Sequence, residues 1–190
     1  MKSQMKLLGV DDGSFHFVDK TTIIIGIIMR ANGYLEGVLK HNIQVDGSDA
    51  TDVLIEMIVH TCHRKQLQAM MLDGASVGGF NIIDIERIFQ ETKLPVITIT
   101  RDPPNFEDIK KALQAHFSDW NVRYNILKKG ELYRIQTKHK PIYLKCVGLE
   151  PEKAKEIITL STIQGVIPEP IRVAHLIASG ICRGESYGKV

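Results

Sequence analysis

The stretch TTIIIGIIMR, residues 21–30, decides the fold of this 190-residue chain. Its density of β-branched side chains is typical of a strand. Ala31, Asn32 and Gly33 follow as a turn, and residues 35–45 predict a second strand that returns beside the first. The two strands form a hairpin, so we expect at least part of the sheet to be antiparallel.

Other predicted strands and helices surround this hairpin. Short apolar runs that end in acidic residues predict buried strands, and apolar residues at helical spacing predict helices between them. In chain order, the predicted elements are a strand at residues 6–10, the hairpin strands at 21–30 and 35–45, a helix from Ser48 or Asp49 to about Lys65, a strand at 67–72, a helix with an apolar stripe at 82–89, and a strand at 95–100. Small polar residues at the start of the first helix are expected to cap it.

This order of elements predicts an α/β fold with an RNase H-like mixed sheet flanked by helices. In such a sheet, an antiparallel three-stranded unit is followed by parallel strands joined through helices, whereas a Rossmann domain alternates strand and helix from the start. Beyond Arg101 we expect helices at residues 105–117, 151–165 and 168–180, and two strands within 131–147. Proline near the first turn suits both later helices, and Gly165 and Gly180 are expected to end them.

Length and composition indicate one globular domain over residues 1–190. With 44% hydrophobic and 24% charged residues, the chain is long enough to bury one substantial core. Its N-terminus lacks the apolar run of a signal peptide, and no window reaches the roughly 18 apolar residues of a membrane span. We therefore expect a soluble, cytoplasmic protein without membrane contact.

Charge and cysteine usage exclude some partners without choosing one. The net charge of +2 is compatible with a polyanionic partner but lacks the strongly basic signature of an obligate nucleic-acid binder. Cys62, Cys146 and Cys182 lie far apart without CxxC spacing, so neither a zinc knuckle nor a disulfide framework is expected. The oligomeric state stays open.

Two aspartates, Asp11 and Asp73, each follow a predicted buried strand. Where such strands lie side by side, their ends bring both carboxylates within reach of one cation. Magnesium, or manganese in its place, prefers oxygen ligands, and two ions about 4 Å apart stabilise the attacking and leaving oxygens of a phosphodiester displacement. Asp12 is a secondary candidate ligand. The alternative for Asp11, Asp12, Gly13 and Ser14 is a simple turn, because these residue types are common turn formers.

A third acidic ligand is expected from the segment VDGSDATD between those two strands, which offers Asp46, Asp49 and Asp52. Asp49 and Asp52 sit three residues apart and could share one helical face. A helix N-terminus also favours acids for capping and dipole reasons. Each of the three acids, taken singly, is more often a cap or a solvated residue than a ligand.

Positive and glycine-rich positions add weaker signals. His175 lies on a largely apolar helix, where a lone histidine is more often a packed core residue than a ligand. Arg172 stands three residues earlier and could hold a phosphate or an acidic neighbour, and Arg101 is similarly ambiguous. The loop at residues 74–79 could cradle phosphate, but the chain has neither a Walker lysine nor GxGxxG, so nucleotide binding is not predicted.

Four segments together carry a resemblance to a known family: LLGVDDGSF, MMLDGASVGGFNIIDI, LPVITITRDPP and IPEPIRVAHLIASGICRGES. They resemble the archaeal endonuclease dU family, which is related to endonuclease V, and the match covers nearly the whole chain. The resemblance implies that Asp11 and Asp73 are metal ligands. It also places His175 where the superfamily has a histidine or aspartate close to the metal.

The chain departs from endonuclease V at several positions. The glutamate that opens the helix before the Asp73 strand is absent, and Asp49 is favoured in its place. The superfamily's lysine corresponds to Arg101, which clamps phosphate but is a poor proton donor because it stays charged. The strand-separating wedge appears only as the segment that begins at Tyr34, and the histidine and basic residues after Gly74 are missing. Recognition of inosine is therefore not expected.

The resemblance implies a magnesium-dependent endonuclease of DNA repair that hydrolyses a phosphodiester bond of DNA near a deaminated base, with deoxyuridine favoured. Asp11, Asp49 and Asp73 would hold the metal. These three aspartates, His175 and Arg101 are the expected catalytic residues. The expected nucleic-acid-binding residues are Tyr34, Gly74, Arg101 and Arg172. The alternative is a catalytically silent RNase H-like module that binds nucleic acid, and nothing in the sequence distinguishes DNA from RNA.

Overall fold

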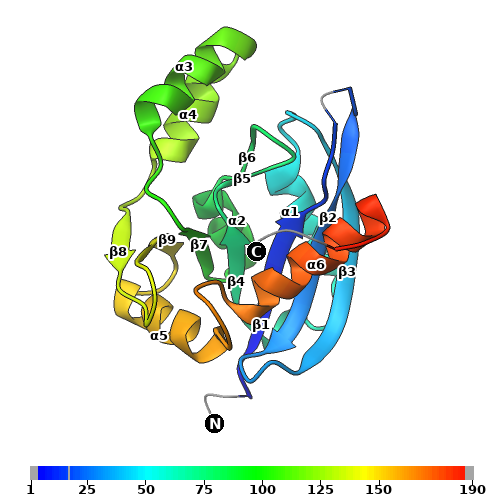
Figure 1. The fold of residues 1–190 in the computed structure, drawn as a ribbon, viewed down its shortest axis with the longest axis vertical. Coiled ribbons are helices and arrows are strands. Elements are labelled where there is room, and N and C mark those ends of the chain that lie inside the picture. The colour runs from blue at the N-terminus through cyan, green and yellow to red at the C-terminus, as the bar shows by residue number, and fades with distance from the viewer. Residues whose placement is uncertain (1–3, 17, 187–190) are drawn as a thin grey trace.

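The computed structural model describes residues 4–16 and 18–186. Its centre is a seven-stranded mixed sheet with the order β3-β2-β1-β4-β7-β9-β8 (Figure 1). The strands are β1 (Lys6–Asp12), β2 (Thr21–Arg30), β3 (Leu35–Gln44), β4 (Leu67–Asp73), β7 (Val96–Thr100), β8 (Tyr133–Ile135) and β9 (Ile142–Val147). A separate two-stranded ribbon consists of β5 (Ser76–Val77) and β6 (Asn81–Ile82).

The predicted hairpin is confirmed and forms one side of this sheet. β2 pairs antiparallel with both β1 and β3, while β1, β4 and β7 run parallel to one another. This is the RNase H-like order expected from the sequence. β9 and β8 extend the sheet antiparallel beyond β7, which confirms the two strands predicted within residues 131–147.

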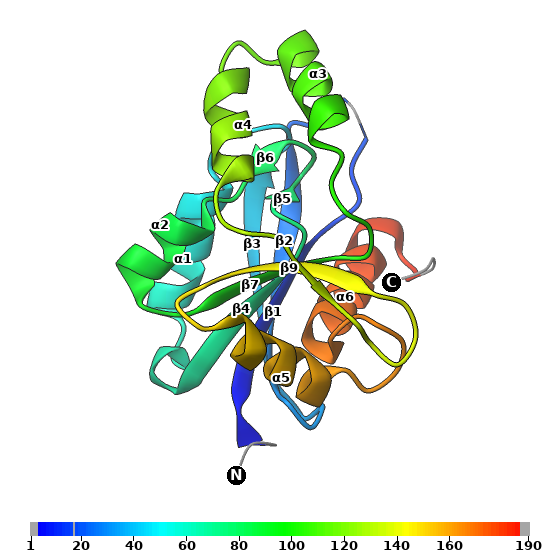
Figure 2. The same ribbon diagram turned by 90° about the vertical axis from the view of Figure 1, so that its left-hand side faces the viewer.

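Helices cover both faces of the sheet and stand beyond one of its ends (Figures 1 and 2). α1 (Ala50–His60) and α2 (Ile85–Thr92) lie on one face, α5 (Pro151–Ser161) and α6 (Glu169–Arg183) lie on the other, and α3 (Phe106–His116) and α4 (Trp120–Lys128) form a hairpin beyond β7. Side chains alternate along β1: Leu8 and Val10 join the core under α1 and α2, whereas Leu7 joins the core under α5 and α6. Within the described ranges, no helix is long and apolar enough to cross a membrane.

Two helices are shorter than predicted. α1 ends at His60 rather than near Lys65, and the 3-10 turn η2 (Arg64–Gln66) follows it. α5 ends at Ser161 rather than at Gly165. Both helices stop shortly after their last buried side chain, and the residues that directly follow each helix are half-buried or exposed.

Two further differences concern the chain after β7. α6 runs straight through Gly180, which the sequence predicted as its end, and stops at Gly184 with a left-handed φ of +82°. α4 was not predicted at all. It is held by a tertiary contact, since the buried Arg123 side chain donates hydrogen bonds to the carbonyl oxygens of Gly47 (2.8 Å) and Phe80 (2.6 Å).

Candidate active site

The carboxyl ends of β1 and β4 lie side by side at one edge of the sheet. The parallel register pairs Val10 with Leu72, so the next residues along the two strands are Asp11 and Asp73. Asp73 also pairs with Ile99 of β7. By the alternation of side chains, Asp11 and Asp73 belong to the face of the sheet that α6 covers.

Gly9 sets the position of α6 on β1. A Cβ atom at Gly9 would lie 2.3 Å from the carbonyl carbon of Pro170 and 2.6 Å from the amide nitrogen of Ile171, so the first turn of α6 rests directly on the strand backbone. Two residues along a strand rise about 6.6 Å and four along a helix about 6 Å. The helix therefore brings His175 over Asp11 at the same level, and their Nδ1 and Oδ2 atoms are 2.8 Å apart.

Asp11, Asp12 and Asp73 form an acidic cluster with shared electrostatics. Burial, followed by the negative charges of Asp12 and Asp73, raises the pKa of Asp11 to about 8. Burial also raises the pKa values of Asp12 and Asp73. The positive charges of Arg101 and His175 oppose the rise at Asp73, which places these two side chains within electrostatic reach of the cluster.

Asp12 connects the cluster to the loop that follows β4. Its Oδ2 accepts a hydrogen bond of 2.7 Å from the Gly78 amide, and its own amide donates to Asp11 Oδ1 at 2.9 Å. Asp11 and Asp12 are the last two residues of β1. The alternative in which both aspartates belong to a simple turn is therefore wrong.

The other predicted acids make contacts elsewhere. Both carboxylate oxygens of Asp49 accept from the Gln44 amide at 3.2 Å, and Oδ1 also accepts from Asn81 at 2.6 Å. Asp46 accepts from the Phe80 amide at 2.8 Å, and Asp52 forms an exposed ion pair of 2.6 Å with Arg87. These hydrogen bonds and the ion pair link the β3–α1 connection and α1 to residues before or in α2. The metal-ligand role of Asp49 stays a prediction.

Asn81 is a buried polar residue that sequence reasoning missed. Its side chain donates to Gln44 O (2.9 Å) and to Asp49, and accepts from the Ala50 amide (3.0 Å). It therefore caps the start of α1, whereas the adjacent Asp49 makes no capping bond. The expected local cap is thus replaced by a side chain from the distant β5–β6 ribbon.

Replacing Asn81 by alanine should destabilise the protein by about 2–4 kcal/mol. The change leaves a buried amide, a carbonyl and a carboxylate each short of one partner. Urea unfolding measures the loss, with the exposed Asn125→Ala as the control. An unchanged midpoint for Asn81→Ala would contradict the role of Asn81 as a cap.

The predicted nucleic-acid-binding residues are spread over the molecule. Tyr34 is 64% exposed and follows Arg30, which pairs with Lys6 at the end of β1 opposite Asp11. The structure therefore does not bring Tyr34 to the acidic cluster. The guanidinium of Arg172 donates to both carboxylate oxygens of Glu169. Of the two roles considered for Arg172, the structure therefore shows the one in which it holds an acidic neighbour.

Gly74 and Arg101 do lie beside the cluster. Gly74 directly follows Asp73 and turns the chain with a φ of +79°, a conformation that side-chain-bearing residues rarely adopt. Arg101 directly follows β7 and is exposed. Among the predicted arginines, Arg101 is the one whose charge acts on Asp73, as His175 also does.

The donor set of the cluster suits a hard divalent cation. Carboxylate oxygens are the ligands such an ion prefers, and Asp11 is only 6% exposed while carrying the repulsion of two acidic neighbours. A cation would relieve that repulsion. In the part of the chain that the structure describes, no three His, Cys, Asp or Glu side chains already stand in a metal-binding arrangement.

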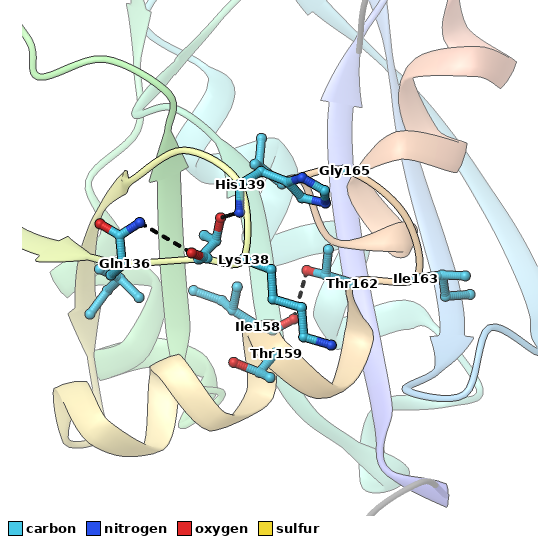
Figure 3. A pocket seen from close by; sticks show the side chains of 11 residues that line it. Gln136, Lys138, His139, Ile158, Thr159, Thr162, Ile163 and Gly165 are labelled. Carbon is cyan, nitrogen blue, oxygen red and sulfur yellow. Dashed lines mark hydrogen bonds between the residues drawn. The ribbon is translucent and has the colours of Figure 1, made fainter.

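A separate hollow of about 390 Å³ lies between the β8–β9 connection and the end of α5 (Figure 3). Gln136, Lys138 and His139 line one side of it, and Thr159 and Thr162 line the other. None of the residues that line this hollow belongs to the predicted site. The hollow therefore contributes nothing to the acidic cluster.

Comparison with known proteins defines the class to which this fold belongs. A crystal structure of Ciona intestinalis endonuclease V, in complex with a 24mer DNA containing an inosine followed by a ribo-adenosine, matches 89% of this chain and 82% of its own with a TM-score of 0.61 and 12% identity. At that identity the likeness concerns the fold alone. The fold is thus the RNase H-like fold of endonuclease V.

Closer similarity defines the family. Residues 3–182 match the Endonuclease dU family model. The UPF0215 protein of Methanothermobacter thermautotrophicus is 42% identical over 190 residues, covering 99% of this chain and 93% of that protein. A crystal structure of a protein of unknown function from Archaeoglobus fulgidus has a TM-score of 0.86 at 37% identity, covering 94% and 99% of the two chains. The chain belongs to the endonuclease dU family, which confirms the resemblance read from its sequence.

Proposed function

We propose that this protein is a divalent-metal-dependent endonuclease that hydrolyses a DNA phosphodiester bond near a deaminated base, with deoxyuridine preferred over deoxyinosine. The observation that carries the proposal is the acidic cluster at the ends of β1 and β4, with His175 2.8 Å from Asp11. The family supports nuclease chemistry. The inosine-containing DNA bound to the Ciona endonuclease V supports DNA as the partner.

In the proposed mechanism, Asp11 and Asp73 would hold Mg²⁺, with Mn²⁺ as the alternative. The ion, when bound, lowers the pKa of water and neutralises charge that develops on the phosphate. His175 fixes the orientation of the Asp11 carboxylate through its Nδ1 contact. Arg101 holds the phosphate of the strand being cut, and because a guanidinium stays charged it does not deliver the proton to the leaving oxygen.

The third ligand can be identified by comparing two variants. Asp12 shares the electrostatics of Asp11 and Asp73, whereas Asp49 is hydrogen-bonded to Gln44 and Asn81. If Asp49 is the ligand, as we propose from the family pattern, Asp49→Asn should raise the magnesium concentration for half-maximal cutting about tenfold or more. If Asp12→Asn has this effect and Asp49→Asn does not, the third ligand is Asp12.

The proposed activity is tested with labelled duplex and single-stranded DNA that contains one uracil, one inosine or neither. Each substrate is incubated with the full chain and magnesium, and in parallel with a chelator. Magnesium-dependent cuts near the uracil, with slower cutting at inosine, are the expected result. Equal cutting of all substrates would contradict the lesion preference, and cutting in chelator would contradict metal dependence.

A silent nucleic-acid-binding module is the second candidate. Arg101 in place of the superfamily lysine, together with the missing glutamate and wedge motif, favours it. Such a module would hold DNA with an ordinary salt dependence and without any need for the divalent ion. Tight binding that is indifferent to magnesium, without a cut on any substrate, would identify it.

A further inference from the structure

A mainly apolar hollow of about 240 Å³ lies beyond the end of the strand that bears Asp73, on the side of the α3–α4 hairpin. Gly74, the residue after Asp73, lies at its wall. Thr98 and Thr100 of β7 and Lys145 of β9 line the hollow together with Phe106 of α3. Figures 1 and 2 show the hairpin beyond the end of β7 and close to the β5–β6 ribbon, so the hollow lies where these elements meet the strand ends.

Thr100 lines this hollow and carries an unused polar group. Its Oγ1 atom is buried and has no hydrogen-bond partner among the described residues. A buried hydroxyl without a partner is uncommon in native proteins, because it loses its bonds to water and gains nothing in return. A ligand that carries an acceptor atom would supply the missing partner.

Lys145 contributes a buried positive charge. The residue is 7% exposed, and its ammonium donates to the carbonyl oxygens of Leu127 and Lys129, each at 2.7 Å. Both partners are neutral, and no ion pair of Lys145 with an acid occurs in the described part of the chain. An ammonium has three donors, so one remains beyond these two bonds. Burial lowers the pKa of Lys145, which reflects the cost of keeping this charge inside.

We propose that this hollow receives one unpaired base of the nucleic acid, and that Lys145 and Thr100 donate hydrogen bonds to carbonyl oxygens of that base. The proposal rests on the endonuclease function proposed above and names the residues that recognise its substrate. The hollow is smaller than the roughly 300–1,000 Å³ of sites for drug-sized ligands, which suits a single base. The ring of Phe106, 5.5 Å from the Lys145 ammonium, offers an aromatic surface for stacking.

The chemistry of the two donors distinguishes uracil from cytosine, the base from which deamination produces it. Deamination replaces an exocyclic amino group, which donates hydrogen bonds, by a carbonyl oxygen, which accepts them. An ammonium donates only, so Lys145 is satisfied by the carbonyl of uracil and is left facing the amino group of cytosine. A site built to bond one such group discriminates strongly against the analogue that lacks it.

The test is a binding measurement that does not depend on cleavage. The affinity of the full chain for single-stranded oligonucleotides with one uracil or one cytosine at the same position is measured by fluorescence anisotropy in chelator. The wild type should favour uracil. Thr100→Val, which is isosteric and removes the unpartnered hydroxyl, should reduce this preference several-fold without lowering thermal stability. Lys145→Met should reduce it by tenfold or more.

Lys128→Met is the matched control, because Lys128 is exposed on the neighbouring α4. This variant should lower the affinity for the uracil and cytosine oligonucleotides by the same factor. Because Lys145→Met removes a buried donor from two carbonyls and could fail to fold, Thr100→Val decides the question alone if necessary. A wild type that binds both bases equally, or variants that fold and keep its full preference, would overturn the proposal.

These outcomes separate the hollow from the proposed endonuclease activity. A wild type that favours uracil in chelator but never cuts, with a preference that falls in the variants, supports base recognition and contradicts the nuclease function. A wild type that cuts near uracil, with variants that keep the full uracil preference, supports the nuclease function and overturns the roles of Thr100 and Lys145.

Discussion

The Asp11→Asn variant is expected to cut uracil-containing DNA about a thousandfold more slowly than the wild type in magnesium. Asp11 is buried beside Asp12 and Asp73 and is oriented by His175, so the change removes one of the charges proposed to hold the cation. Loss of several kcal/mol of charge stabilisation corresponds to this factor, at about 1.4 kcal/mol for each tenfold change. Single-turnover nicking measures the rate, and a rate within threefold of wild type would remove Asp11 from the metal centre.

The same variant should be more stable than the wild type at high pH without metal. The pKa of Asp11 is about 8 in the folded protein against an ordinary value of 3.8, so the folded chain binds this proton more tightly than the unfolded chain. The contribution of Asp11 to the free energy of unfolding therefore falls as pH rises from about 4 to about 8. Asp11→Asn avoids this loss, and its melting temperature in chelator should exceed that of wild type by several degrees above pH 8. A lower value there would contradict the burial argument.

Gly9→Ala should damage both stability and cleavage. The new methyl group would meet the backbone of Pro170 and Ile171, which cannot move aside as a flexible side chain can. Overpacking of this kind costs about 1–3 kcal/mol or more. Displacing α6 also moves His175 away from Asp11, so we expect cleavage to fall about a hundredfold even at temperatures where the variant is folded.

Gly180→Ala on the same helix is the control for Gly9→Ala. A Cβ atom at Gly180 meets nothing within 4 Å, and its position inside α6 favours alanine by about 0.5–1 kcal/mol. In urea unfolding, Gly9→Ala should therefore lower the stability and Gly180→Ala should raise it. In nicking assays, only Gly9→Ala should lose activity. Equal effects would mean that the contact between Gly9 and Pro170 does not position the helix.

The central part of the fold could be predicted because its signals are local. The β-branched run in residues 21–30 and the turn after it define the hairpin, and Asp11 and Asp73 end runs whose burial is evident from composition. Once the hairpin fixes the strand order, the two strand ends must be neighbours. The proximity of the two acids therefore follows from a pattern within each short segment.

The remainder could not be predicted because it depends on contacts between distant segments. Asn81 caps a helix that begins far earlier in the chain, and Arg123 holds α4 through carbonyl oxygens of two other loops. Thr100 and Lys145 are ordinary strand residues until the sheet and the α3–α4 hairpin enclose them. For Tyr34 the local signal was misleading. The segment that begins at Tyr34 resembles the wedge motif, but this likeness does not show at which end of the sheet the turn lies.

The Arg123 side chain joins two elements that the sequence separates. By binding the carbonyls of Gly47 and Phe80, it ties the α3–α4 hairpin to the loop that Asp12 holds through the amide of Gly78. The hairpin and this loop should therefore open as one cooperative unit, with a common free energy of opening in amide hydrogen exchange. Arg123→Met would divide that unit into two, so that the hairpin amides exchange faster while those of the loop keep the protection that Asp12 provides.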